Sequence, residues 1–112
     1  MTIPMTKSKV ATIIKEELIQ RIKNGPPVQI INVLDPKDYE LGFIKGSLKI
    51  PLDQLERRSY ELDKKIDVVT YCAGYDCPAS GKAAEKLSAQ GFRVFAYEGG
   101  IKEWKEAGLP TE

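Results

Sequence analysis

The chain has 112 residues, with 17 Lys and Arg against 16 Asp and Glu, and it contains no histidine. A chain of this length is expected to form one domain, and its net charge of +1 excludes the basic footprint of nucleic-acid-binding domains. The absence of histidine excludes histidine-ligated metal sites and catalytic arrangements that use an imidazole base. Acid–base chemistry would have to come from carboxylates, lysines, tyrosines, cysteines or the backbone.

No apolar run approaches the roughly 20 residues of a transmembrane helix, and the first residues lack the apolar stretch of a secretory signal. We therefore expect a cytoplasmic protein that binds neither membranes nor nucleic acid. Residues 1–8 are expected to form a flexible N-terminal arm, and residues 9–112 to form a single domain.

The first third of the chain predicts a strand, a helix and a second strand. Residues 10–13 suit a short strand, and the helix that follows ends at the Gly25-Pro26-Pro27 stop. This helix places four apolar residues on one face: Ile14, Leu18, Ile19 and Ile22. Residues 28–34 form a mostly apolar, β-branched run, which is typical of a strand buried on both faces.

Shorter elements are predicted next. Asp35 is expected as the N-cap and Pro36 as the first residue of a short helix that ends at Gly42. Residues 47–50 suit a brief strand, and another short helix is expected from Pro51.

The second half continues the alternation. Residues 67–71 form a buried strand that runs directly into Cys72, and a helix is expected over about 78–90. Its buried face is predicted to hold Ala79, Ala83, Ala84 and Leu87. A strand over 92–97, a turn at Gly99-Gly100 and a helix over 101–107 complete the chain, with Tyr97 and Trp104 as core anchors. The alternation predicts a mostly parallel sheet with helices on both faces.

Cys72 is the candidate nucleophile because it lies at the carboxyl end of a buried strand, where parallel sheets usually place their sites. The N–H groups of Ala73, Gly74, Tyr75 and Asp76, together with the following helix N-terminus, would stabilise negative charge on its sulfur. A thiolate is favoured in such surroundings. The alternative is a buried, inert cysteine at a strand end.

Cys77 follows with Cys-x4-Cys spacing, which differs from the Cys-x2-Cys spacing of thioredoxin-like and zinc motifs. Two cysteines are too few for a four-cysteine zinc site, and we expect no metal and no cofactor. Cys77 either packs as a small apolar residue at the helix start or acts as a resolving thiol toward oxidised or persulfidated Cys72. A bridge between them requires Cα atoms within about 7 Å.

Four stretches of the sequence occur together, in this order, in one known family. The first two are Glu17-Leu18 and the segment from Ile31 through Asp35-Pro36 and Gly42-Phe43-Ile44 to Ile50-Pro51-Leu52. The others are Val68-Val69-Thr70-Tyr71-Cys72 and the segment from Glu98-Gly99-Gly100 through Trp104 to Gly108-Leu109-Pro110. From about residue 10 to its C-terminus, the chain resembles single-domain rhodanese-like proteins.

This resemblance implies a three-layer α/β/α domain around a five-stranded parallel sheet. It also implies that Cys72 is the catalytic cysteine, which accepts a sulfane sulfur as a persulfide and passes it to a thiophilic acceptor. Residues 73–77, which are Ala73, Gly74, Tyr75, Asp76 and Cys77, would form the substrate-binding loop. The implied partners are small sulfur donors and acceptors or a protein that carries a persulfide.

Three positions depart from the family pattern. Asn32 and Leu34 stand where the family usually has the Asp and Arg of Asp-Val-Arg, and Phe43 stands where it usually has a histidine. These departures are either structural drift, since a buried ion pair can be replaced by apolar groups at little cost, or signs of a changed donor or partner.

The loop itself also departs from the family, since it carries Asp76 and no arginine. Thiosulfate is therefore expected to be a poor donor, unless Lys45 or Lys82 reaches the loop. The loop is longer than the common form, as in the related phosphatase and arsenate reductase branches. Pro78 stands where those branches need an arginine, so phosphatase chemistry is not expected.

The sequence thus predicts a sulfurtransferase or persulfide carrier. Two alternatives stay open: a redox-responsive thiol protein that uses Cys72 and Cys77, and a non-catalytic rhodanese-like binding module.

Overall fold

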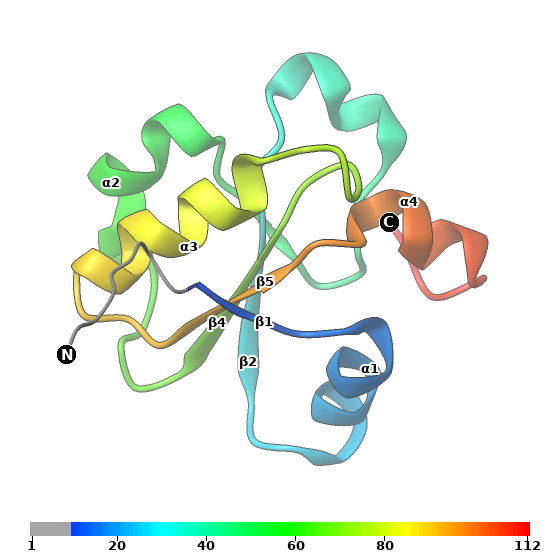
Figure 1. Cartoon of the computed structure of the whole chain (residues 1–112), viewed down its shortest axis with the longest axis horizontal. Coiled ribbons are helices and arrows are strands. Elements are labelled where there is room, and N and C mark those ends of the chain that lie inside the picture. The colour runs from blue at the N-terminus through cyan, green and yellow to red at the C-terminus, as the bar shows by residue number, and fades with distance from the viewer. Residues whose placement is uncertain (1–9) are drawn as a thin grey trace, which may run out of the picture.

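The computed structural model describes residues 10–112, so the predicted arm over residues 1–8 lies outside the described residues. One sheet of five strands is formed in the order β1-β5-β4-β2-β3, and every neighbouring pair is parallel (Figure 1). The strands are β1 Ala11–Thr12, β2 Val28–Asn32, β3 Leu48–Lys49, β4 Asp67–Tyr71 and β5 Val94–Tyr97. The predicted five-stranded parallel sheet is confirmed.

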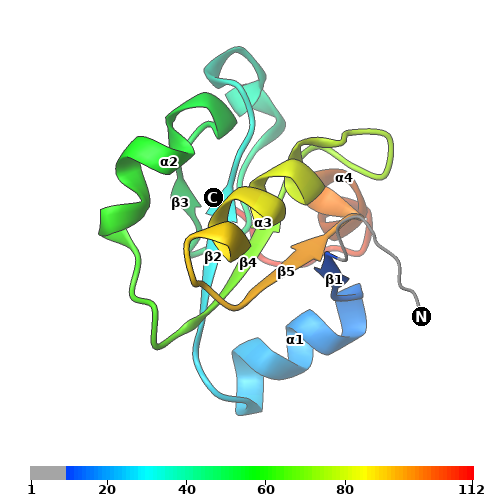
Figure 2. The same ribbon diagram turned by 60° about the vertical axis from the view of Figure 1, so that its left-hand side comes forward.

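The helices are α1 Lys15–Asn24, α2 Leu55–Arg58, α3 Ala79–Ala89 and α4 Gly100–Glu106, and three short 3₁₀ turns cover Pro36–Leu41, Leu52–Gln54 and Ser59–Glu61. α3 packs on β4 and β5 and contacts α2, whereas α1 lies on the opposite side of the sheet (Figure 2). These layers confirm the predicted α/β/α arrangement. Within residues 10–112, no helix is long and apolar enough to cross a lipid bilayer.

The core lies between these layers and is built mainly from aliphatic side chains. Leu18 of α1 and Leu87 of α3 are fully buried, and Ala83 and Ala84 let α3 approach the sheet closely. The predicted core anchors are confirmed: Tyr97 and Trp104 are both buried, and their rings meet edge to face with centroids 6.1 Å apart.

Two predicted helix faces need correction. Leu18 is buried, but Ile14 is 56% exposed and Ile22 is 47% exposed. Ile14 precedes the first turn of α1 with extended backbone, so its side chain leaves the helical face. In α3, Ala79 is only half-buried and Ser80 is buried instead, where the Ser80 carbonyl accepts a hydrogen bond from the Thr70 hydroxyl at 2.8 Å.

Some strand and helix boundaries also differ from the predicted ones. β2 stops at Asn32 rather than at residue 34, because the Asn32 side chain accepts the Leu34 N–H at 2.8 Å and replaces a strand partner. Asp35 does precede a helical turn that starts at Pro36, but its side chain makes no capping bond. Its carbonyl oxygen accepts the Asp38 N–H instead, at 2.8 Å.

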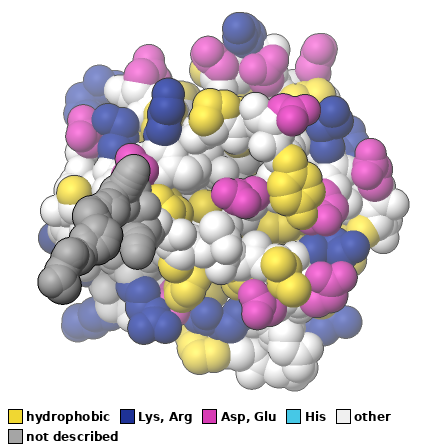
Figure 3. Space-filling view, in the orientation of Figure 1, with side chains coloured by type: hydrophobic (Ala, Val, Ile, Leu, Met, Phe, Trp, Pro, Cys, Tyr) yellow, Lys and Arg dark blue, Asp and Glu magenta, His cyan; other side chains and the backbone are white. Residues whose placement is uncertain are grey.

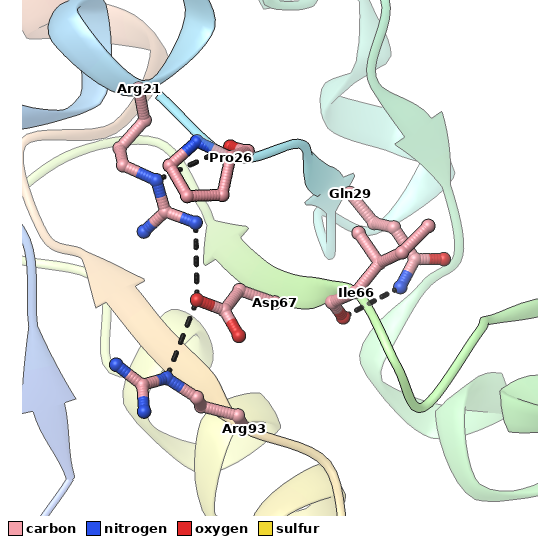
Figure 4. A network of polar contacts seen from close by, with 6 residues as sticks. All are labelled: Arg21, Pro26, Gln29, Ile66, Asp67 and Arg93. Atoms are coloured by element: carbon pink, nitrogen blue, oxygen red, sulfur yellow. Dashed lines mark hydrogen bonds and ion pairs between the residues drawn. The ribbon is translucent and has the colours of Figure 1, made fainter. Parts of the chain in front are cut away.

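A charged cluster fixes the amino end of β4, at the opposite end of this strand from Cys72. Asp67 accepts Nη2 of Arg21 on α1 at 3.1 Å and Nε of Arg93 before β5 at 3.3 Å (Figure 4). Beside it, the Gln29 side-chain amide donates to the carbonyls of Ile66 at 3.0 Å and Asp63 at 2.8 Å. This cluster ties α1, β2 and β4 together.

Candidate active site

Cys72 lies directly after β4, the central strand of the sheet. Because β4 pairs with β2 and β5, its last residue, Tyr71, is held in register opposite Asn32 on one side and Tyr97 on the other. The Val33 N–H continues this pairing by donating to the Tyr71 carbonyl at 3.0 Å. Cys72 is 3% exposed, and the loop after it leads through residue 78 into α3. The predicted placement of this cysteine is confirmed, and its catalytic role stays a prediction.

The loop joins the two cysteines. Cys72 and Cys77 form a disulfide, and their Cα atoms lie 6.3 Å apart. This separation is within the limit of about 7 Å that a bridge requires. Cys77 is half-buried, so it is the more accessible of the two sulfur-bearing residues. The geometry needed for a resolving thiol is therefore present, and the resolving role itself stays a prediction.

The first residues of α4 hold the loop through backbone hydrogen bonds. The Ile101 N–H donates to the Cys72 carbonyl at 3.0 Å, and the Lys102 N–H donates to the Ala73 carbonyl at 2.9 Å. Within the loop, the Cys77 N–H donates to the Gly74 carbonyl at 3.0 Å. The carbonyl groups of the loop are thus engaged by helix amides and by a tight turn.

Gly100 makes this contact between α4 and the loop possible. Its φ is +65°, and a Cβ at this position would lie 2.5 Å from the Cys72 carbonyl oxygen and 2.7 Å from the Ala73 carbonyl carbon. Only glycine fits so close an approach in this backbone conformation. The predicted Gly99-Gly100 turn therefore allows α4 to pack directly against the cysteine loop.

The amides of residues 73–76 have no backbone acceptor, since within the described chain no N–H of these residues donates to another backbone group. These amides lie between Cys72 and the N-terminus of α3, and both kinds of group favour negative charge. The structure thus retains the features on which the prediction of a stabilised Cys72 thiolate rests.

A hollow of about 570 Å³ opens beside Cys72, and we call it the sulfur-side hollow. Its walls come from residues 33–35 after β2, residues 51–53 after β3, and the two cysteines. Its lining also includes the acidic residues Asp35, Asp38 and Asp53 and the basic residues Lys37 and Lys86. A donor molecule can reach the neighbourhood of Cys72 through this hollow.

A second hollow of about 410 Å³ lies between the loop and α4, and we call it the α4-side hollow. It is lined by residues 73–77 together with Gly99, Lys102, Glu103 and Glu106. Cys77 lines both hollows, whereas Cys72 lines only the sulfur-side hollow. The two sulfurs of the disulfide therefore differ in the directions from which they can be approached.

Glu103 connects the loop tip to the core. Its carboxylate accepts hydrogen bonds from the Tyr97 hydroxyl at 2.7 Å and from the Tyr75 hydroxyl at 3.3 Å. Burial, followed by the bond to Glu103, raises the pKa of Tyr97 well above its usual value. The negative charge of Glu103 is the main cause that raises the pKa of Tyr75. Both tyrosines therefore stay protonated and act as donors near neutral pH.

Lys102 is the cation that lines the α4-side hollow beside the loop. Its side chain passes beside Gly74, where an added Cβ would lie 3.4 Å from the Lys102 Cδ. The structure does not place the expected lysines there: Lys45 lines a separate hollow with Trp104, and Lys82 lines neither hollow at the loop.

Acidic groups outnumber the cation at the α4-side hollow, where Asp76, Glu103 and Glu106 face Lys102. The space-filling view shows magenta acidic side chains over the region of the loop and α4, with dark-blue side chains mainly toward the edges (Figure 3). Negative charge at this hollow opposes the approach of anionic ligands.

A buried hydrogen-bond network surrounds the Tyr71 hydroxyl. It accepts the Asn32 side-chain amide at 3.2 Å and the Ile44 N–H at 2.9 Å, and it lies 2.8 Å from the Ser47 hydroxyl. Burial is the main cause that raises the pKa of Tyr71. Because two donors occupy the lone pairs of the phenol oxygen, the Tyr71 proton is directed to Ser47.

The structure distinguishes the three departures from the family pattern by the contacts that each residue makes. Asn32 belongs to the buried Tyr71 network, and the Phe43 ring packs against Tyr39 at 5.1 Å and Lys49 at 4.4 Å. These two residues have structural partners, in agreement with the drift alternative. Leu34 instead lines the sulfur-side hollow, where it replaces a family arginine. It is the one of the three departures that lines the hollow beside Cys72.

The three-layer fold and the cysteine loop at the end of its central strand define an α/β domain with a thiol site. The family model of the rhodanese-like domain matches residues 15–107. The chain therefore belongs to the rhodanese-like family, and the resemblance found in its sequence is confirmed.

Relatives include proteins of different overall size. The chain is 33% identical over 100 residues to an HTH-type transcriptional regulator of Mycobacterium tuberculosis, a match that covers 89% of this chain and 44% of the regulator. It is 33% identical over 96 residues to a protein of Allochromatium vinosum named sulfurtransferase, which covers 85% of this chain and 88% of that protein. The chain thus spans less than half of the regulator's length.

Solved structures share the fold. A rhodanese-like domain protein from Staphylococcus aureus aligns with a TM-score of 0.78 and 28% identity, over 92% of this chain and 99% of that one. It is named as a member of the same domain family, so sequence and structure comparisons agree.

Several residues at the site were missed by the sequence reasoning. These are Lys102, Glu103 and Glu106 of α4. The Gly99-Gly100 pair before a helix was the one available signal for a close approach. Lys102 and Glu103 reach the loop only because α4 folds back against it, which local sequence patterns do not encode.

Proposed function

We propose that this chain is a sulfurtransferase or persulfide carrier that uses Cys72 to move a sulfane sulfur from a donor to a thiophilic acceptor. The observation that carries this proposal is the position of Cys72 at the end of the central strand, beside the sulfur-side hollow and followed by a loop in which the N–H groups of residues 73–76 donate to no other described backbone group. Membership of a family that includes a relative named sulfurtransferase supports it.

The reaction needs two displacements at sulfur. With the disulfide reduced, the Cys72 thiolate attacks the outer sulfur of a persulfide R–S–SH, and the thiol R–SH leaves. The resulting Cys72–S–S⁻ carries its charge on the terminal sulfur, where the N–H groups of residues 73–76 stabilise it electrostatically. An acceptor nucleophile then attacks that terminal sulfur and regenerates the Cys72 thiolate. No metal or cofactor takes part in these steps.

The surroundings of the loop favour a persulfide donor over thiosulfate. Leu34 removes a family cation from the sulfur-side hollow, and Asp76 adds negative charge on the loop. A dianion is disfavoured in such a field, whereas a low-molecular-weight persulfide or a persulfide-bearing protein carries less charge at the reacting sulfur. Because Cys72 must be reduced to react, we place the reaction in a reducing, cytoplasmic compartment.

Intact-mass measurement of the reduced protein after incubation with a persulfide donor tests the proposal. We expect a gain of about 32 Da that dithiothreitol removes, and a cyanolysis assay that turns over with persulfide donors. A Cys72→Ser variant is the control and should show neither. A wild-type protein that neither gains sulfur nor turns over with any donor would instead be a non-catalytic rhodanese-like binding module.

A second candidate function is a redox-responsive thiol protein, which the Cys72–Cys77 disulfide favours. A peroxide would oxidise the Cys72 thiolate to a sulfenic acid, and Cys77 would then displace water to form the disulfide. Thiol counting and non-reducing peptide mapping after mild peroxide treatment should recover this one intrachain bridge, reversibly. Recovery of higher oxides on Cys72 with Cys77 still free would remove this candidate.

A further inference from the structure

We propose that Cys77 ends the sulfur-transfer cycle when no acceptor is present, by releasing the bound sulfur as hydrosulfide. This inference rests on the proposed Cys72 persulfide. The Cys77 thiolate attacks Sγ of Cys72 in the group Cys72–S–SH, and its electron pair forms the Cys72–Cys77 bond. The bond to the outer sulfur breaks, and HS⁻ leaves with that electron pair and the persulfide proton. The outer sulfur is thereby reduced to hydrosulfide and the Cys77 sulfur is oxidised, while Sγ of Cys72 stays at the oxidation level of a disulfide.

The loop geometry supports this step. In the structure, Cys77 is bonded to Sγ of Cys72, which is the atom that would carry the outer sulfur. The turn closed by the Cys77 N–H and the Gly74 carbonyl at 3.0 Å keeps the two residues within one short loop. Intramolecular attack of this kind proceeds at a high effective concentration and needs no second protein molecule.

The unequal exposure of the two cysteines indicates which sulfur an external thiolate attacks when the disulfide is reduced. Cys72 is buried and lines one hollow, whereas Cys77 is half-buried and lines both. An external thiolate is therefore expected to attack Cys77 and to release Cys72, whose thiolate the loop amides stabilise. A dithiol supplies both electrons, since its second thiol resolves the mixed disulfide on Cys77. The carboxylates of Asp76, Glu103 and Glu106 disfavour anionic reductants at this hollow.

The experiment follows the fate of one sulfur atom on the full chain. Protein reduced with dithiothreitol and desalted without oxygen is mixed with one equivalent of cysteine persulfide and no acceptor, and intact mass and free hydrosulfide are followed over time. The wild type should gain about 32 Da and then fall to about 2 Da below its reduced mass, releasing one hydrosulfide per chain. Dilution of the protein should not change this rate, because the step is intramolecular.

The control variant is Cys77→Ser, in which the persulfide should persist about tenfold longer or more, because the intramolecular thiol is gone. Cys77→Ala repeats the measurement if the serine variant is unstable, and peptide mapping of the wild type locates the new disulfide without any substitution. Cys72→Ser should release no hydrosulfide.

The outcomes separate this inference from the proposed function. A wild-type persulfide that lasts as long as that of Cys77→Ser overturns the release step and leaves sulfur transfer standing. A failure of wild type and Cys77→Ser alike to gain sulfur overturns both. A mixed disulfide that a monothiol forms on Cys72 rather than Cys77 overturns the proposed direction of reset.

Discussion

We expect the reactivity of reduced Cys72 to depend on backbone groups rather than on a charged side chain. The amides of residues 73–76 and the N-terminus of α3 follow it in the chain, and Lys102 lines the α4-side hollow, which Cys72 does not line. Backbone dipoles keep their positions when salt or neighbouring side chains change. Thiolate stability at this site should therefore respond more to loop geometry than to surface charge.

We expect the reduced protein to be alkylated first at Cys72. Iodoacetamide labelling across a range of pH should give an apparent pKa for Cys72 below the free-thiol value of about 8.5, because its thiolate is stabilised by the loop. Peptide mapping of partially labelled protein identifies the site, and Cys77→Ser isolates the Cys72 titration. Faster labelling of Cys77, or no labelling of Cys72 before unfolding, would contradict this expectation.

Asp76 should limit the use of thiosulfate. A carboxylate about 6 Å from an incoming anion costs on the order of 1 kcal/mol or more, so Asp76→Asn should raise kcat/KM for thiosulfate and Asp76→Arg should raise it further. Lys102→Gln, which removes the one cation lining the α4-side hollow, should lower it. All three effects should shrink as ionic strength rises. Brisk wild-type turnover of thiosulfate, or no response to these substitutions, would falsify the electrostatic account.

The contact between α4 and the cysteine loop is the element-scale feature on which the site depends. Replacing Gly100 with alanine introduces a Cβ 2.5 Å from the Cys72 carbonyl oxygen at a φ of +65°. The left-handed backbone alone costs an L-residue about 1–2 kcal/mol, and the clash adds to it. We expect Gly100→Ala to lower the free energy of unfolding by about 2 kcal/mol or more and to slow persulfide formation.

Gly108→Ala is the matched control, because Gly108 also has positive φ, at +73°, but nothing lies within 4 Å of its added Cβ. Gly108→Ala should lower the free energy of unfolding through the left-handed backbone alone, and it should leave the rate of persulfide formation unchanged. Equal effects of the two substitutions on sulfur loading would mean that α4 does not position the loop.

At the other end of β4, the Arg21–Asp67 pair should matter more than the Arg93–Asp67 pair. The side chains of Arg21 and Asp67 are 21% and 22% exposed, whereas Arg93 is 73% exposed. Arg21→Gln is expected to cost about 1 kcal/mol in urea unfolding, and Arg93→Gln close to nothing, because exposed pairs contribute little. Sulfur loading of the folded protein should be the same in both variants, since this cluster lies away from Cys72.

Elements with strong local patterns could be predicted from the sequence. The limits of β4 were predicted residue for residue, because residues 67–71 are bounded by a turn and by the cysteine loop, and α3 was placed within one residue at each end. The positions of Ile14 and Ile22 were wrong, because an apolar side chain becomes buried only where another element covers it. The two hollows, and the role of Leu34 in one of them, arise from segments far apart in the chain.

At the scale of the whole molecule, two buried tyrosines connect the sheet to its surroundings. Tyr71 bonds to Asn32, Ile44 and Ser47, and Tyr97 bonds to Glu103. The pKa values of both phenols are raised in the folded state, mainly by burial. Alkaline pH should therefore lower the free energy of unfolding of the whole domain.

Above the unfolded tyrosine pKa of about 10, the unfolded chain binds fewer protons than the folded chain, so the free energy of unfolding falls as pH rises. Urea unfolding at about pH 8 and about pH 11 should show this loss. Tyr71→Phe and Tyr97→Phe should each reduce the pH dependence. Equal slopes in the wild type and both variants would mean that buried phenols do not govern alkaline stability.

The strand order has a consequence for the order in which the protein is made. Ala11 and Thr12 of β1 pair with Phe95 and Ala96 of β5, and α4 follows β5 (Figure 1). A growing polypeptide therefore exposes its first strand to the ribosome surface and to chaperones until β5 has emerged. Cys72 emerges before the α4 amides that hold its loop. We expect a nascent chain to carry a Cys72 thiol of ordinary reactivity until α4 has emerged and packed against the loop.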